Sequence, residues 1–406
     1  MTRRERLDSV PMPKIPAILA AALLGAALQA SAAPFTPKTD SEVVERLPST
    51  ANDPSVRRVD SLRKQLVAKP DNDALRIEIA RRYFDMAMAQ GDPRYVGYAA
   101  AALNPAEKTS ARDSNFWLAR GLIQQYSHDF DGGMKSLSIA SELDPKSPEP
   151  IAWRAAIDMV QAKYPEALSE CTKLVPLTHP LFAQGCTAYV QAATGHLSEA
   201  YAALKKEVAA ASGTAPELIL WAQTRLAEMA IRQGKPAEAE AHFKEALKQG
   251  VTDQFLLGAW SDFLIAQNRS PEALKLLADW ERSDVLLLRL ALAGKAARDS
   301  RADNWASQLR DRFEAAALRG DRLHEQEAAR FELDVEGHPD KALAYASRNY
   351  MQQKESRDAE ILMRTALAAN QARAAQPALD WLRESRYEDA SFAKLADQLV
   401  AKGATR

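Results

Sequence analysis

The sequence predicts an all-α protein, a right-handed α-solenoid of about eight or nine helix pairs that ends in a capping helix. Two observations predict this fold class. Alanine supplies 77 of the 406 residues while aromatic residues make up only 7%, a composition typical of closely packed helices rather than strands. One sequence phrase also returns about every 34 residues, which is typical of stacked helical repeats.

The charge balance and the cysteine count exclude several classes of protein. The chain carries 53 Lys and Arg against 54 Asp and Glu, a net charge of −1. A protein that binds nucleic acid without sequence preference needs a basic excess to displace counterions, so we expect no nucleic-acid partner. Two cysteines are too few for a disulfide-rich scaffold or a four-cysteine zinc site.

The first 33 residues have the pattern of an export signal. Basic residues come first, an apolar run follows from Ile15 to Leu28, and small residues at 30–33 precede Pro34. This order is typical of a secretory signal peptide, and the apolar run is shorter than the roughly 20 residues of a membrane span. We therefore expect a protein of the periplasm, or one secreted beyond it, with no transmembrane segment after the signal is removed.

Two features of this segment leave alternatives open. The run Thr2–Leu7 is similar to a twin-arginine export motif, but it also fits an ordinary basic segment ahead of the apolar run. Met12 opens a compact signal of its own, so the natural start is either Met1 or Met12.

A proline-rich stretch separates the signal from the repeats. Four prolines lie between Pro34 and Pro54 among Ser, Thr and Asp residues, and proline at this density blocks helix propagation. We expect a signal peptide over residues 1–33, a flexible leader over 34–55, the helical array over 56–400 and a disordered tail over 401–406.

The repeated phrase places a small residue at the same point of each second helix. Runs such as Gly234–Glu240 and Asn268–Leu274 show the phrase clearly. The equivalent small residues are Ala99, Gly133, Ala167, Ala200, Ala239, Ala273 and Ala342, with spacings of 34, 34, 33, 39, 34 and 69 residues. A small side chain there lets the two helices of a pair cross closely. Residues 387–400 have the pattern of a terminal capping helix.

This pattern resembles the tetratricopeptide repeat, a helix–turn–helix unit of 34 residues. The resemblance covers residues from about 57 to 400 and is looser over 74–106, 148–210 and 284–385. In such arrays the first helix of each pair lines a concave groove that holds a partner. By position, this groove would present Asn115, Gln125, Tyr126, Trp221, Glu228, Arg232, Phe255 and Asp262. Tyr126 and Trp221 are the strongest candidates, because large aromatic side chains dominate interface energetics.

The two cysteines predict a disulfide. Cys171 falls on the second helix of one unit and Cys186 on the first helix of the next, and adjacent units place these helices against each other. In an oxidising compartment the favoured interpretation is a Cys171–Cys186 bond. Two reduced, buried thiols are the alternative.

No catalytic constellation is evident, and we expect neither an enzyme nor a metal or cofactor. The run His324–Ala328 begins like a zinc-protease helix but lacks the second histidine. We therefore expect a non-catalytic adaptor or scaffold that binds a protein partner in assembly of a cell-envelope complex. A chaperone for exported clients, and an accessory protein of a metal-handling membrane protein, are the alternatives.

Overall fold

The computed structural model describes residues 53–320 and 322–403. The predicted signal peptide and nearly all of the predicted leader lie outside these ranges, as do residues 404–406. The first described helix, α2, spans Pro54–Ala68, so the helical part begins two residues before the expected start of the array.

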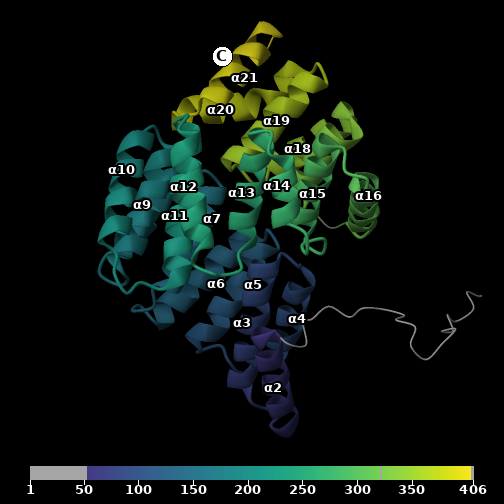
Figure 1. Cartoon of the computed structure of the whole chain (residues 1–406). Coiled ribbons are helices and arrows are strands. Elements are labelled where there is room, and N and C mark those ends of the chain that lie inside the picture. The colour runs from purple at the N-terminus through teal and green to yellow at the C-terminus, as the bar shows by residue number, and fades with distance from the viewer. Residues whose placement is uncertain (1–52, 321, 404–406) are drawn as a thin grey trace, which may run out of the picture. The chain divides into compact units, whose positions relative to one another are not determined.

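Every described element is a helix, and Figure 1 shows them stacked in consecutive pairs. The nine pairs are α3 (Asp73–Gln90) with α4 (Arg94–Leu103), α5 (Ser114–Tyr126) with α6 (Phe130–Leu143), α7 (Glu149–Val160) with α8 (Tyr164–Lys173), α9 (Pro180–Ala193) with α10 (Leu197–Ala210), α11 (Pro216–Arg232) with α12 (Pro236–Leu247), α13 (Gln254–Ala266) with α14 (Ser270–Leu276), α15 (Asp284–Ala297) with α16 (Ala302–Leu318), α17 (Glu325–Phe331) with α18 (Pro339–Tyr350), and α19 (Ser356–Ala368) with α20 (Gln376–Ser385). Short turns η3 (Asn104–Ala106), η4 (Glu332–Glu336) and η5 (Ala372–Ala375) join some of them, and α21 (Ala390–Ala401) is the last helix. The predicted α-solenoid is confirmed, with its pair number and its terminal helix.

The small residues of the repeated phrase lie where the helices of a pair cross. The alanines at positions 99, 167, 200, 239, 273 and 342 are all 0% exposed. At the α5–α6 crossing, a Cβ added to Gly121 would lie 2.7 Å from Leu137 Cγ and 3.3 Å from the Gly133 carbonyl oxygen. The close approach of the two helices therefore requires small residues at the crossing.

The turn inside each pair contains one residue in the left-handed backbone conformation. The nine residues are Gly91, His128, Ala162, Gly195, Gly234, Asn268, Arg298, Gly337 and Asn370, with φ between 55° and 80°. Such a residue ends a helix by turning the chain away from the helix axis. The same left-handed conformation therefore ends the first helix of every pair, even where the residue is not glycine or asparagine.

The predicted disulfide is present. Cys171 on α8 and Cys186 on α9 are bonded, with their Cα atoms 5.5 Å apart. Cys171 is fully buried and packs with Ala155, Ala167 and Val190. The bond joins the third pair to the fourth.

Late pairs also contact early ones, so the array coils back on itself. A Cβ on Gly91, after α3, would lie 2.6 Å from the Ser283 hydroxyl that precedes α15. Further along, the Lys354 amide donates to the Val160 carbonyl at 2.7 Å. The Leu197 amide donates to the Glu388 carboxylate at 2.6 Å. These contacts join the end of α7 and the start of α10 to the segments on either side of α19 and α20.

Candidate functional site

The eight residues expected to line the groove lie on three first helices. Asn115, Gln125 and Tyr126 are on α5, Trp221, Glu228 and Arg232 on α11, and Phe255 and Asp262 on α13. The structure uses them in different ways.

The two aromatic candidates pack between neighbouring pairs. The Trp221 ring lies 5.5 Å from the Phe182 ring, and a Cβ added to Gly185 would come within 2.8 Å of its Cη2 atom. Tyr126 meets Phe84 edge to face, with ring centroids 6.3 Å apart. Both rings therefore join one first helix to the preceding one.

The acidic candidates belong to ion pairs on the first helices. Glu228 accepts from Arg225 at 2.7 Å, and the Arg225 guanidinium lies 4.6 Å from the Tyr189 ring centroid. Asp262 pairs with Arg289 at 2.8 Å and with Arg330 at 2.7 Å. Burial alone would raise the pKa of Asp262, but the two guanidinium groups outweigh it and hold that pKa below its usual range.

The remaining three candidates have unlike surroundings. Arg232 contacts the C-terminal helices, because its Nε donates to the Glu388 carbonyl at 3.1 Å. Asn115 and Phe255 are exposed near the first turns of their helices, Phe255 by 39%. Gln125 is half-buried, and its Cβ would lie 3.4 Å from a Cβ added to Gly133.

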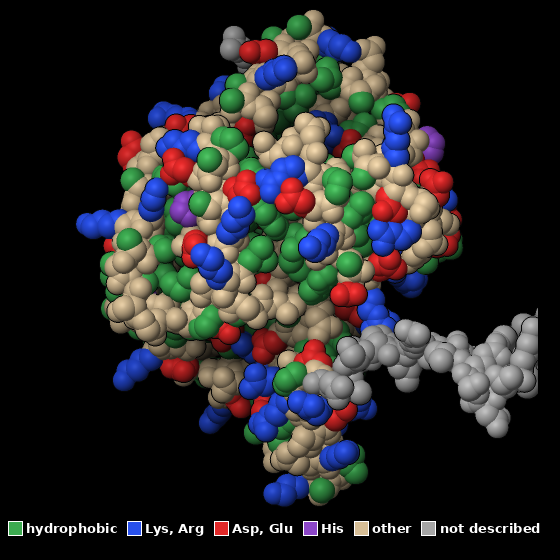
Figure 2. All heavy atoms as spheres, viewed as in Figure 1, with side chains coloured by type: hydrophobic (Ala, Val, Ile, Leu, Met, Phe, Trp, Pro, Cys, Tyr) green, Lys and Arg blue, Asp and Glu red, His purple; other side chains and the backbone are tan. Residues whose placement is uncertain are grey.

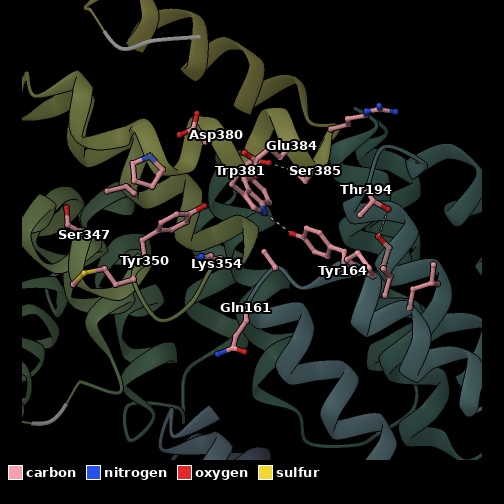
Figure 3. A pocket seen from close by; sticks show the side chains of 18 of the residues that line it. Gln161, Tyr164, Thr194, Ser347, Tyr350, Lys354, Asp380, Trp381, Glu384 and Ser385 are labelled. Atoms are coloured by element: carbon pink, nitrogen blue, oxygen red, sulfur yellow. Dashed lines mark hydrogen bonds between the residues drawn. The ribbon is translucent and has the colours of Figure 1, made fainter. Parts of the chain in front are cut away.

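A cavity lies where the late pairs meet the early ones, and we call it the inter-turn cleft. It has a volume of about 910 Å³ and lies between the α7–α8 turn with the end of α9 on one side and α18 with α20 on the other. Figure 3 shows three rings around it, Tyr164 from the start of α8, Tyr350 from the end of α18 and Trp381 from α20. Aliphatic side chains complete much of the wall: Leu168, Val190, Met351 and Leu362.

One hydrogen bond joins two of the three rings. Trp381 Nε1 donates to the Tyr164 hydroxyl at 2.7 Å, across 217 residues of sequence. Burial raises the pKa of Tyr164 to about 12. Burial also raises the pKa of Tyr350, so both phenols keep their protons at neutral pH.

Charged side chains surround the opening. Asp380 and Glu384 line the α20 side, and Lys354 and Arg386 also line the cleft. Asp380 accepts from Arg383 at 2.8 Å and from Gln376 at 3.1 Å. Met351, beside the cleft, is 72% exposed. An apolar interior with a charged rim is the usual composition of a binding pocket.

The sequence did not single out this cleft. Neither Trp381 nor Tyr164 was among the residues expected to form a site. No local pattern brings them together, because their contact depends on how far the array has turned over the pairs between them.

The geometry of the repeats decides the fold type. Nine helix pairs follow one another at the spacing of the sequence phrase, each with a left-handed residue in its turn, and buried small residues occupy the crossings. The fold is that of a tetratricopeptide-repeat array. The helix pairs of this array run from α3 to α20.

Among known proteins, similarity to this chain was found only in solved structures. No protein-family model matches the chain, and no curated protein matches it. PilW, described as a widely conserved type IV pilus biogenesis factor, is 20% identical over 53% of this chain and 96% of its own, with a TM-score of 0.38. A Rap protein solved with competence and sporulation factor is 14% identical over 85% of this chain and 99% of its own, with a TM-score of 0.46. Yeast Tom70 is 12% identical over 87% of this chain and 85% of its own, with a TM-score of 0.41. We draw nothing about function from likeness at this level.

The described residues lack both a metal-binding cluster and a membrane-spanning helix. Within residues 53–320 and 322–403, no group of three or more His, Cys, Asp or Glu side chains could hold a metal ion. Among the same residues, no helix is long and apolar enough to cross a membrane. On the face shown in Figure 2, Lys and Arg are interspersed with Asp and Glu.

Proposed function

We propose that this tetratricopeptide-repeat protein is a non-catalytic adaptor that holds a protein partner during assembly of a complex in the cell envelope. We place the partner's binding site at the inter-turn cleft instead of the first-helix groove. The groove candidates Trp221, Tyr126 and Arg232 are engaged in contacts within the chain, whereas the cleft is open.

The observation that most supports a binding site at the cleft is that the cleft is preformed. The hydrogen bond from Trp381 to Tyr164 and the one from the Lys354 amide to Val160 hold its two sides together. A site held in its binding shape loses less conformational entropy on association than a flexible one. Its volume of about 910 Å³ is large enough for several side chains of a partner segment.

Two features support export to the periplasm as part of the proposal. Residues 1–33 have the signal-peptide order of a basic segment, an apolar run and small residues. The disulfide between Cys171 and Cys186 belongs to a class of bond that persists in oxidising compartments and is rare in the cytosol.

Crosslinking in the native host tests the adaptor role. A photo-crosslinking amino acid replaces Met351 beside the cleft, and the matched control carries it at Leu318, which is 90% exposed at the end of α16. We expect one or two stoichiometric partners from position 351 and none of them from position 318. A broad spread of exported proteins from position 351 would make the protein a chaperone instead. Equal capture of the same species from both positions would mean that the partner does not bind at the cleft.

Fractionation tests the compartment. The protein is expressed from its whole gene in the native host. Osmotic shock should then release it in a form that is shorter by about the length of the signal. Protein that stays with a cytosolic marker would refute the periplasmic part of the proposal. This result would not bear on where the partner binds.

A further inference from the structure

One buried hydroxyl in the inter-turn cleft has no hydrogen-bond partner. Tyr350 is 4% exposed, and its hydroxyl makes no hydrogen bond to any described residue. An unpaired buried hydroxyl is unfavourable, because it has lost its hydrogen bonds to water without replacing them. Figure 3 shows the Tyr350 side chain extending into the space beside Trp381. Because burial raises the pKa of this phenol, the hydroxyl retains a proton that it can donate.

A second hydroxyl beside the same space also keeps a proton to donate. Among the described residues, the Tyr164 hydroxyl accepts from Trp381 Nε1 at 2.7 Å and has no acceptor of its own. Since this bond uses only a lone pair, the phenolic proton remains available. The cleft thus presents two phenolic donors between aromatic walls.

Other polar groups of the wall are largely engaged. The hydroxyls of Thr194 and Ser385 donate to carbonyls of their own helices, at 3.0 Å and 2.7 Å. The Asp380 carboxylate already accepts from Arg383 and Gln376. The Glu384 carboxylate also lines the cleft but is 75% exposed. A ligand segment that lies between the three rings therefore has to bring acceptors, and each N–H group it places there has few partners to find.

We propose that the inter-turn cleft binds a proline-rich, extended segment of the partner protein. Proline contributes a carbonyl acceptor at each residue and no N–H donor. Its ring offers a flat apolar face to Tyr164, Tyr350 and Trp381, and a polyproline helix is already ordered before it binds. Carbonyls of the segment accept from the Tyr350 and Tyr164 hydroxyls, so the buried Tyr350 hydroxyl gains the partner that it lacks. This inference rests on the proposed adaptor function and names the chemistry of the segment recognised.

A labelled peptide tests the chemistry directly. The probe is a fluorescein-labelled oligoproline flanked by lysines, and the control is an oligoalanine of equal length with the same flanks. Fluorescence anisotropy with the mature chain should show saturable binding of the oligoproline and much weaker binding of the oligoalanine. Equal binding of the two peptides, or binding of a fatty acid with none of the oligoproline, would overturn the inference.

The variant Tyr350→Phe isolates the hydroxyl because it keeps the ring. We expect it to weaken oligoproline binding roughly three- to tenfold, the usual worth of one hydrogen bond, without lowering the thermal midpoint of the free protein. The matched control is Tyr345→Phe, which removes a hydroxyl from the same helix, α18, outside the cleft lining, and should leave binding unchanged. Oligoproline binding by Tyr350→Phe at the wild-type level would refute the assigned contact.

The outcome also separates this inference from the adaptor role. If oligoproline does not bind while position 351 still captures a discrete partner in cells, the ligand chemistry is wrong and the adaptor function stands. If oligoproline binds with the expected dependence on Tyr350 but no partner is captured, the cleft chemistry stands and the adaptor function fails.

Discussion

Arg232 lies over the ring of Tyr387, with its guanidinium carbon 3.8 Å from the ring centroid. The two residues are 155 positions apart, Arg232 at the end of α11 and Tyr387 in the segment between α20 and α21. The same guanidinium donates to the Glu388 carbonyl at 3.1 Å and to the Ala192 carbonyl. One side chain therefore ties the fourth and fifth pairs to the C-terminal segment, next to the inter-turn cleft.

Replacing Arg232 with alanine should loosen the C-terminal segment. The change removes a stacked cation and hydrogen bonds from a charged donor, contributions of about 1–3 kcal/mol together. We expect amides of α20 and α21 to exchange with solvent about tenfold faster or more in Arg232→Ala, while amides of α5 and α6 keep their protection. Hydrogen exchange followed by mass spectrometry measures this segment by segment.

The matched control is Arg120→Ala. The Arg120 guanidinium also faces a ring, Trp117, at 5.5 Å, and pairs with Glu107 at 2.6 Å, but within neighbouring elements of the array. Exposed pairs of this kind contribute little to stability, so exchange in α20 and α21 should not change. Equal effects of the two variants would mean that Arg232 does not hold the late pairs against the early ones.

The disulfide should stabilise the third and fourth pairs. It joins residues 15 positions apart, and closing a loop of this length is worth about 3 kcal/mol in the chain-entropy model. The double variant Cys171→Ala with Cys186→Ala should therefore unfold at lower denaturant concentration, as followed by circular dichroism in urea.

Reductant supplies the second arm of that experiment. It should lower the unfolding midpoint of the wild-type protein to about that of the double variant and leave the variant unchanged. A wild-type midpoint insensitive to reductant, with both thiols shown to be reduced by alkylation after the reduced sample is acid-quenched and unfolded, would show that the bond adds nothing to stability.

The repeat architecture could be predicted from the sequence because its determinants are local. Ala239 and Ala273 mark helix crossings whose partners lie within one repeat, and both are fully buried as expected. The left-handed turn residues explain part of the looser pattern, in the α7–α8 and α15–α16 pairs. Ala162 and Arg298 occupy positions that glycine or asparagine takes in other pairs, so the turn signal is absent there although the turn is the same.

The cleft could not be predicted because it depends on the sum of many small rotations. Trp381 meets Tyr164 only because the intervening pairs bring the end of the array back beside its third pair. Each inter-repeat rotation is set by side chains such as Trp221, and a small error in each accumulates along the array. The contacts of Arg232 could not be predicted for the same reason, since its partners lie in a later turn.

A variant of Trp221 tests whether its ring packs between neighbouring repeats or lines the first-helix groove. Its ring lies against Phe182 and Gly185, so Trp221→Ala should remove inter-repeat packing and lower the free energy of unfolding by about 3 kcal/mol. Phe255→Ala is the matched control, because Phe255 is 39% exposed on a first helix and should cost less than about 1 kcal/mol. Urea unfolding measures the free energy of unfolding of both variants. A Trp221→Ala variant as stable as Phe255→Ala would mean that the Trp221 side chain faces the groove and does not pack between repeats.

Asp358 should make the stability of the α18–α19 region fall as the pH rises toward neutrality. The side chain is 0% exposed, accepts from Asn349 Nδ2 at 2.8 Å and from the Glu355 amide at 3.0 Å, and faces the charges of Glu355 and Arg357. Burial, reinforced by the Glu355 carboxylate and opposed by Arg357, raises the pKa of Asp358 to about 7 from 3.8.

The sign follows from proton uptake. Between these two pKa values the folded state holds a proton that the unfolded state has lost, so the free energy of unfolding decreases with pH by up to about 1.4 kcal/mol per unit. Asp358→Asn cannot ionise, and its curve between pH 5 and pH 7 should be flatter than that of the wild type. Part of the slope should remain, because burial also raises the pKa of Asp158, to about 6. Urea unfolding across this range tests the prediction, with the exposed Asp131→Asn as a control that keeps the wild-type slope. Parallel curves for the wild type and Asp358→Asn would show that Asp358 titrates alike in the folded and unfolded chain.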